Sequence, residues 1–516
     1  MNRRFFNTAG PCRSEIHYTV DPLPRLTGVR ELIDSEQYFI LHAPRQVGKT
    51  TYLYALMHAL NAEGRYTVLQ VNIQPAQVAR TPERAMHVIA SCIYRQSTFH
   101  LPETERPFAL NEDSPQISSL QNYLSDWAQA NPKPIVLLLD EADALLDENF
   151  LALLGQLRAG FEARPKGFPQ SVALVGLRDV RDYKIRLRPD SQSMGTASPF
   201  NVKSESLFMQ GFTRAEMEAL LRLHGDATGQ IFAPEVCNEF WRLTEGQPWL
   251  VNALAREITV KLFDNDTSQA ITLAAVATAK EQLIARRDTH LDSLADKLRE
   301  APVKRVIQAI IEGEPPLADA FDDAVQYTAD LGLTTRSNPV RFANRIYGEI
   351  IPRVLSSSME RIIPTDFVDP VWYIRSGRLD MDALLRAFQE FYREHAEAWL
   401  EKYDFREVGR QLMLMAFLQR ITNGGGRIDR EMAVGRGRCD LCVTYGGERF
   451  VLELKLLRHP RDEARGLSQT ARYCQSLGLT RGYLLLFVTD DSQPWEQRLR
   501  WEERMQDGVA ISLLGM

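Results

Sequence analysis

The first residues whose types and spacing could do chemistry lie early in the chain. They read Ala43, Pro44, Arg45, Gln46, Val47, Gly48, Lys49, Thr50 and Thr51, which matches the pattern G-x-x-x-x-G-K-[ST] except that Ala43 replaces the first glycine. In this pattern the glycine lets backbone N–H groups close around phosphate, the lysine reaches the β and γ oxygens, and the threonine hydroxyl binds Mg²⁺ at a helix N-terminus. The segment therefore predicts a nucleoside triphosphate site, with ATP and Mg²⁺ as its ligands.

A second acidic pair follows an apolar run at residues 135–139. Asp140 and Glu141 stand where that run ends, after the phosphate-binding pattern in chain order. We expect Asp140 to hold the metal and Glu141 to polarise the attacking water, because both tasks need a carboxylate beside the triphosphate. By itself, the stretch 140–143 could equally be an exposed acidic loop.

A separate group of chemistry-bearing residues lies near the C-terminus. Two β-type runs, 437–443 and 450–455, are joined across Gly446 and Gly447, which is typical of a hairpin. Glu453 and Lys455 share one face of their run because alternate strand residues point the same way, and the hairpin brings Asp440 beside them. An acid and an amine on an otherwise apolar strand are costly to bury without a purpose. The alternative is a surface hairpin whose charges merely pair.

The rest of the chain supplies the elements that position these groups. β-type runs at 38–41, 67–73, 135–139, 172–177 and 206–209 alternate with helical stretches at 50–63, 82–96 and 117–130, which favours an α/β fold with a parallel sheet covered on both faces. Residues 213–263 are helical throughout and are expected to form a lid. Two helices at 297–312 and 317–331, followed by short β-type runs at 333–335 and 340–342, suggest a winged helix.

Length and composition bound the domain count and the class of protein. A chain of 516 residues exceeds one hydrophobic core, so we predict an ATPase core at 1–212, a helical lid at 213–270, a winged-helix-like domain at 271–358 and a further domain at 365–516. No stretch reads as a secretory signal or a membrane span, which favours a soluble, cytoplasmic protein. Cys439 and Cys442 form a lone C-x-x-C that reads as two half-buried strand cysteines rather than as a zinc or redox site.

Charge gives a local case for nucleic acid rather than a global one. The net charge is −6, yet residues 401–480 hold 14 Lys and Arg residues against 10 Asp and Glu residues. This excess of +4 inside an acidic chain is a weak footprint for a polyanion such as DNA.

The first 350 residues resemble the archaeal-type ATPases and their STAND relatives of the AAA-like class. The resemblance rests on residues 42–50, on Leu139 to Asp143, and on the run from Thr244 to Leu250 that opens a lid helix. It implies a five-stranded P-loop core, a helical lid, a winged helix and self-association into an oligomer. The winged helix reads DNA in some relatives and is structural in others, and because no basic recognition face stands out in this sequence we favour the structural role. The resemblance also implies that Arg178 senses the γ-phosphate. The basic stretch 178–188 could be an arginine finger, a DNA contact or a solvated loop.

The C-terminal region resembles the PD-(D/E)xK nuclease superfamily, which implies a restriction-endonuclease-like α/β domain. Asp440 and Glu453 would bind Mg²⁺ and Lys455 would orient or activate water, although Cys439 stands where the family name has proline. Gln469 and Tyr473 match the family's Q-x-x-x-Y element, and Glu407 matches its upstream metal-associated acid. The fused arrangement is similar to ATPases implicated in microbial DNA defence or mobile elements, an analogy of fold rather than of residues.

Three functions are consistent with these patterns. The leading hypothesis is an ATP-controlled, Mg²⁺-dependent DNA endonuclease or exonuclease. The alternative is an ATP-driven oligomeric signalling or scaffold switch whose C-terminal fold binds nucleic acid without cleaving it. A motor that moves DNA past the nuclease ranks last, because the sequence shows no series of helicase motifs.

Overall fold

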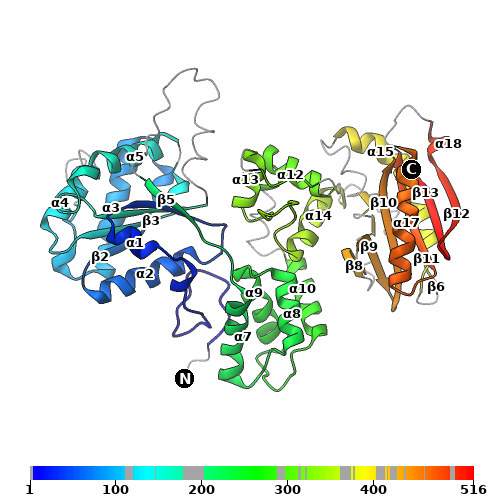
Figure 1. Cartoon of the computed structure of the whole chain (residues 1–516), viewed down its shortest axis with the longest axis horizontal. Coiled ribbons are helices and arrows are strands. Elements are labelled where there is room, and N and C mark those ends of the chain that lie inside the picture. Colours follow the sequence, from blue (N-terminus) through cyan, green and yellow to red (C-terminus); the bar gives the residue numbers. More distant parts are fainter. Residues whose placement is uncertain are drawn as a thin grey trace. The chain divides into compact units, whose positions relative to one another are not determined.

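The computed structural model describes most of the chain, in two compact units. Described are residues 4–110, 120–145, 147–177, 203–286, 297–311, 315–319, 322–360, 373–375, 378–402, 413–414, 417–418, 427–434, 437–457, 459–488 and 494–516. The first unit comprises Met1–Arg286 with Ala318–Ser337, and the second comprises Arg287–Leu317 with Asn338–Met516. Figure 1 labels the elements, and each unit is described by itself. The four-part division expected from sequence stays a prediction.

A five-stranded parallel sheet forms the centre of the first unit. Its strand order is β2-β3-β4-β1-β5, with every pair parallel. The strands are β1 (Tyr38–His42), β2 (Thr67–Asn72), β3 (Ile135–Asp140), β4 (Ser171–Gly176) and β5 (Lys203–Phe208). The predicted α/β class and parallel sheet are confirmed. Apolar strands of a parallel sheet are buried on both faces, which requires a helical layer on each side.

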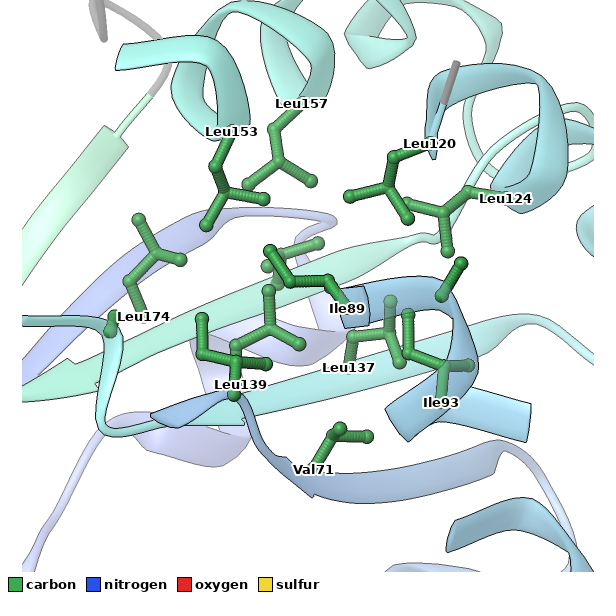
Figure 2. Close-up of a cluster of buried hydrophobic side chains, with 14 of the residues drawn as sticks. Val71, Ile89, Ile93, Leu120, Leu124, Leu137, Leu139, Leu153, Leu157 and Leu174 are labelled. Atoms are coloured by element: carbon green, nitrogen blue, oxygen red, sulfur yellow. The ribbon is translucent and has the colours of Figure 1, made fainter. Parts of the chain in front are cut away.

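Helices cover both faces of this sheet. One face packs against α3 (Pro82–His100), α4 (Leu120–Ala130) and α5 (Asp147–Ala159), and the other packs against α1 (Val29–Asp34) and α2 (Lys49–Glu63). Figure 2 shows the first core, where Leu137 and Leu139 of β3 meet Ile89 of α3 and Leu153 of α5. Burying one such leucine contributes about 1.5–3 kcal/mol. This core therefore stabilises β3, the strand whose C-terminal end carries the acidic pair.

Capping residues define the first turn of the helices that matter most to the site. The N-cap of α2 is Gly48, whose φ of 103° is open to glycine but costly for other residues. The Thr81 side chain accepts the Arg84 N–H at the start of α3. Thr213 and Glu216 form a reciprocal capping box at the start of the lid. Such caps contribute about 1 kcal/mol each and fix where each helix begins.

Helices follow the sheet in the region 213–270, which was expected to form a lid. This region contains α7 (Arg214–Thr228), α8 (Pro234–Thr244), α9 (Pro248–Arg256) and the π-helical segment η6 (Glu257–Leu262), and α10 (Leu273–Arg286) follows it. Short 3-10 helices connect other elements: η1 (Leu23–Arg25), η2 (Gln74–Val78), η3 (Glu103–Glu105), η4 (Ala142–Ala144) and η5 (Phe161–Ala163). No described helix has both the length and the apolar character that crossing a membrane requires.

The region expected to form a winged helix contains α12 (Ala301–Ile311), α13 (Asp323–Asp330) and α14 (Arg345–Glu360). The two short β-type runs are single bridging residues, Thr334 and Phe342, rather than strands. After α13 the chain turns through Gly332 at a φ of 76°, where an added Cβ would lie 2.6 Å from Pro44 Cβ. Gly332 therefore packs directly against the phosphate-binding loop.

The second unit contains a six-stranded mixed sheet in the order β12-β13-β11-β10-β9-β8. Its elements are β6 (Ile374–Arg375), β7 (Arg378–Leu379), α15 (Met381–Lys402), β8 (Arg427–Val434), β9 (Gly437–Tyr445), β10 (Glu448–Leu457), α17 (Pro460–Ser476), β11 (Arg481–Val488), α18 (Trp495–Arg498), β12 (Arg500–Gln506) and β13 (Val509–Gly515). β9 and β10 form the predicted hairpin, antiparallel with Glu448 opposite Tyr445, and β10 pairs in parallel with β11.

Candidate functional site

The phosphate-binding loop joins β1 to α2, and its backbone is left-handed at two positions. Gln46 and Gly48 adopt φ values of 60° and 103°. Ala43, which replaces the first glycine of the pattern, has no positive φ; its N–H donates to Gly176 O (3.1 Å) and its side chain is buried. The loop therefore tolerates alanine there, since that position directly follows the strand and needs no glycine conformation.

Lys49 lies inside this loop with its ammonium group buried. Its Nζ donates to Ala43 O at 2.9 Å and to Pro44 O at 3.1 Å. Burial lowers the pKa of Lys49, and the nearby carboxylates of Glu141, Asp140 and Asp143 oppose that shift. A desolvated ammonium held by two carbonyls is positioned to exchange them for phosphate oxygens.

Asp140 connects the loop to the end of β3. Its Oδ2 accepts the Thr50 hydroxyl at 2.9 Å and the Gln70 amide at 3.4 Å, and its Oδ1 accepts the Glu141 N–H at 3.0 Å. The carboxylate is 1% exposed, and burial raises its pKa. The structure thus brings together the hydroxyl and the carboxylate predicted to share Mg²⁺. Gln70 was not foreseen.

Glu141 and Asp143 complete the acidic end of β3. Glu141 has a left-handed φ of 58°, which turns the chain sharply after the strand. Burial, followed by the charges of Asp143 and Asp140, raises the pKa of Glu141. Asp143 Oδ1 is buried with no hydrogen-bond partner among the described residues, and Gly176 leaves room for it, since a Cβ there would lie 2.8 Å from this oxygen. An unpartnered buried carboxylate oxygen is costly, so this oxygen is available to accept a hydrogen bond from a ligand.

A pocket of about 150 Å³ adjoins the loop. It lies between the N-terminal segment, the loop residues Gln46 to Gly48 with Thr51, and Trp249 of the lid. Cys12 N–H donates to Thr51 Oγ1 (3.0 Å), and Trp249 Nε1 donates to Thr8 O (2.9 Å), so hydrogen bonds fix two walls. Such a largely apolar pocket beside a phosphate site suits a nucleobase.

Arg25 supports the same loop and was missed by the sequence analysis. Its guanidinium donates to Val47 O (3.0 Å) and Gln210 O (2.5 Å) and stacks on Phe212 at 5.0 Å. Burial lowers its pKa. These contacts span 22 and 185 residues of sequence, and no local pattern reveals them.

Two predicted site residues lie outside the described part of the chain, namely Arg178 and Glu407. Arg45 is described and solvent-exposed. The charge of Arg45 lowers the pKa of both Lys49 and Glu141, so Arg45 lies near the site.

Asp440, Glu453 and Lys455 come together on the β9–β10 hairpin, as predicted. Lys455 Nζ lies 2.8 Å from Glu453 Oε1 and 3.9 Å from Asp440 Oδ2. Asp440 Oδ2 also accepts the Leu454 N–H at 2.8 Å, while Glu453 Oε2 accepts the Asp440 N–H at 3.4 Å. The Glu453 side chain is 2% exposed and that of Asp440 is 39% exposed, so the cluster runs from the interior to the surface.

The electrostatics of this cluster favour a cation. Burial and the charge of Asp440 raise the pKa of Glu453 to about 7, against the opposing effect of Lys455. Burial lowers the pKa of Lys455, but the two carboxylates outweigh it, and the net pKa is raised. The described residues hold no group of three or more His, Cys, Asp or Glu side chains that could hold a metal. Mg²⁺ commonly uses only one or two carboxylates plus phosphate and water, so the pair fits it.

Helix α17 packs over the cluster. Gly466 permits this approach, since a Cβ there would lie 2.7 Å from Leu484 Cδ1 and 3.2 Å from Lys455 Cγ. Gln469 is half-buried with its Oε1 unpartnered in the described structure, whereas Tyr473 is 7% exposed and packs in the core with Cys442. Cys442 is a fully buried free cysteine, more buried than the half-buried strand position expected for it. Gln469 is therefore better placed than Tyr473 to meet a ligand.

The parallel sheet, the loop before α2 and the acidic end of β3 together define a P-loop NTPase fold. The chain belongs to the AAA-like domain family, whose sequence pattern matches residues 27–338. The predicted AAA-like P-loop assignment is thereby confirmed.

Solved structures similar to the chain include three ATPase-related proteins. The Walker-type ATPase of Pyrococcus abyssi is 15% identical, covers 67% of this chain and 99% of its own, and gives a TM-score of 0.47. Cdc6p from Pyrobaculum aerophilum is 15% identical over 67% of this chain and 98% of its own, with a TM-score of 0.34. The Thermotoga maritima RuvB Holliday junction branch migration motor is 13% identical over 63% and 91%, with a TM-score of 0.33. No curated protein matches the chain.

Proposed function

We propose that the chain binds and hydrolyses ATP with Mg²⁺ and that this cycle controls a Mg²⁺-dependent DNA nuclease on the β9–β10 hairpin. The observation that carries the ATPase half is the hydrogen bond between Thr50 and Asp140, which places the expected metal ligands within 2.9 Å of each other beside Lys49. The DNA partner and self-association into an oligomer belong to this proposal.

In the ATPase site each residue has one task. Lys49 exchanges its loop carbonyls for β- and γ-phosphate oxygens, and the backbone N–H groups around Gly48 close on the same phosphates. Glu141 accepts a proton from the attacking water, a role that its raised pKa suits. Mg²⁺ held by Thr50 and Asp140 would neutralise charge on the phosphates.

The pocket beside the loop is assigned to the nucleobase. The pocket is lined by Trp249 and Pro248 of the lid and by the segment around Thr8. A bound base would therefore touch both the lid and the N-terminal segment of the first unit. Nucleotide binding would then hold the lid against the core, which gives the cycle a mechanical output.

In the nuclease site the chemistry is phosphodiester hydrolysis. Asp440 and Glu453 would hold Mg²⁺, which lowers the pKa of bound water and draws charge from the scissile phosphate. Lys455, 2.8 Å from Glu453, orients the attacking water, and the partnerless Gln469 Oε1 accepts a hydrogen bond from it or from substrate.

The two halves are tested separately. ATP hydrolysis should be lost in Lys49→Ala and retained in Lys455→Ala, while Mg²⁺-dependent DNA cleavage should be lost in Lys455→Ala. ATP hydrolysis that persists in Lys49→Ala would overturn the ATPase assignment. Cleavage that persists in Lys455→Ala would overturn the nuclease assignment.

A further inference from the structure

A second pocket adjoins the N-terminal segment, and no P-loop residue lines it. Its volume is about 450 Å³, and its polar lining includes Arg13, His17 and Arg256 together with Asn7 and Thr8. Asn7 and Thr8 also line the first pocket, so this stretch of backbone is a shared wall. No residue of the proposed ATPase or nuclease chemistry lines the second pocket.

Two of these residues are cations without a carboxylate partner. Among the described residues neither Arg13 nor Arg256 forms an ion pair, and Arg256 instead lies over the Phe5 ring at 5.3 Å. Both guanidinium groups act on His17, where each lowers the imidazole pKa after the larger effect of burial; Glu15 opposes them more weakly. The local field is therefore positive.

His17 adds an oriented donor. Its Nδ1 accepts the Arg13 N–H at 3.0 Å, which assigns the ring proton of the neutral imidazole to Nε2. The ring is 6% exposed and stands edge-on against Phe5, with centroids 4.8 Å apart, so its direction is fixed. The described structure gives His17 a hydrogen bond at Nδ1 but none at Nε2, and His17 lines the pocket.

We propose that this second pocket binds a phosphate group, free or within a nucleic-acid backbone. Two guanidinium groups and an imidazole N–H form a donor set that matches the several acceptor oxygens of phosphate, and the anion neutralises two charges that no described carboxylate pairs. The site is independent of the proposed nuclease.

The shared wall gives the second pocket a consequence for the first. Thr8 O accepts the Trp249 indole N–H at 2.9 Å, and the segment continues to Cys12, which donates to Thr51 beside the P-loop. A phosphate bound between Arg13 and Arg256 restricts the movement of this segment. Because the segment also lines the first pocket, phosphate binding stabilises that part of the first pocket.

The test follows His17 by NMR in the full chain labelled on histidine. The chain has nine histidines, and His17→Gln assigns the resonance. Lys49→Ala is the background, because it weakens phosphate binding at the P-loop. One arm titrates inorganic phosphate, another titrates an oligothymidylate, and sodium chloride at equal ionic strength measures non-specific screening.

We expect a saturable shift of the His17 resonance with one or both phosphates but not with chloride. Arg256→Gln and Arg13→Ala should each weaken binding roughly tenfold, as expected for loss of a charge-assisted hydrogen bond. Lys261→Ala, an exposed cation of η6 that does not line the pocket, should leave it unchanged. Response to the oligonucleotide alone assigns a nucleic-acid backbone, and response to both assigns the phosphate group itself. A resonance that neither phosphate moves, or binding that is unchanged in both arginine variants, overturns the proposal.

Discussion

Thr50 Oγ1 donates a hydrogen bond of 2.9 Å to Asp140 Oδ2, across 90 residues of sequence. This bond ties the first turn of α2 to the end of β3, so the two proposed Mg²⁺ ligands are already in position. Because a pre-positioned site loses little entropy when it binds, the pair should dominate the Mg²⁺ dependence of nucleotide binding.

We predict that Thr50→Val weakens Mg²⁺-ATP binding by about tenfold or more, since it removes a metal ligand and one of the hydrogen bonds to the buried Asp140 carboxylate. Thr50→Ser keeps the hydroxyl and should bind nearly as well. Isothermal titration with and without Mg²⁺ measures both. Equal affinity in Thr50→Val and the native chain would contradict the assigned role.

Glu141→Gln should separate hydrolysis from binding. The glutamine keeps the shape of the side chain but cannot accept a proton, so we expect hydrolysis to fall about 10²–10⁴-fold while ATP still binds. Rate and affinity are measured on the same preparation. Because the pKa of Glu141 is raised, native hydrolysis should also increase with pH through the range above that of an ordinary glutamate. Hydrolysis that survives in Glu141→Gln would assign the proton acceptor elsewhere.

The pKa of Glu453, about 7, predicts the pH dependence of the C-terminal cluster. Its folded pKa lies above its unfolded value of 4.5, so the stability it contributes is present below about pH 4.5 and is lost as pH rises through 7. Metal binding needs the carboxylate, so Mg²⁺ affinity at this site should rise with pH through 7 and release a proton. Titration calorimetry in buffers of different ionisation enthalpy counts that proton, and Glu453→Gln should abolish its release.

Gly332 offers a test of the segment that packs on the P-loop. Gly332→Ala places a Cβ within 2.6 Å of Pro44 Cβ at a φ of 76°, so it should cost about 1 kcal/mol or more of stability and also weaken ATP binding. Gly229→Ala is the matched control, with a φ of 77° and open space around its Cβ. It should carry the backbone strain alone and bind ATP normally. Weakened ATP binding in both variants would mean that strain rather than contact is responsible.

Sequence was enough to predict the parallel sheet and most of the P-loop geometry, because their signals are local. The β-type runs that correspond to β1 to β5 were recognisable, and the glycine at position 48 has the positive φ that its motif requires. The backbone explains why Ala43 can replace the glycine, since this position does not have a positive φ.

Residues missed by the sequence analysis act through long-range contacts. Gln70 reaches Asp140 from the neighbouring strand, and Arg25 holds the loop from a preceding turn. Neither belongs to a spaced motif. In the C-terminal unit, the Q-x-x-x-Y spacing drew attention to Tyr473, but core packing buries that ring and leaves Gln469 as the side chain with an unused acceptor.

Control of DNA cleavage by nucleotide is tested most directly by one assay. Linear, circular and single-stranded DNA are incubated with Mg²⁺, with and without ATP, and the native chain is compared with Lys49→Ala and Lys455→Ala. We predict cleavage of at least one form by the native chain, a rate that ATP changes, loss of that change in Lys49→Ala, and loss of cleavage in Lys455→Ala. Cleavage that proceeds equally with and without ATP in the native chain, or no cleavage of any DNA, would contradict the account and favour an ATP-driven switch that does not cut.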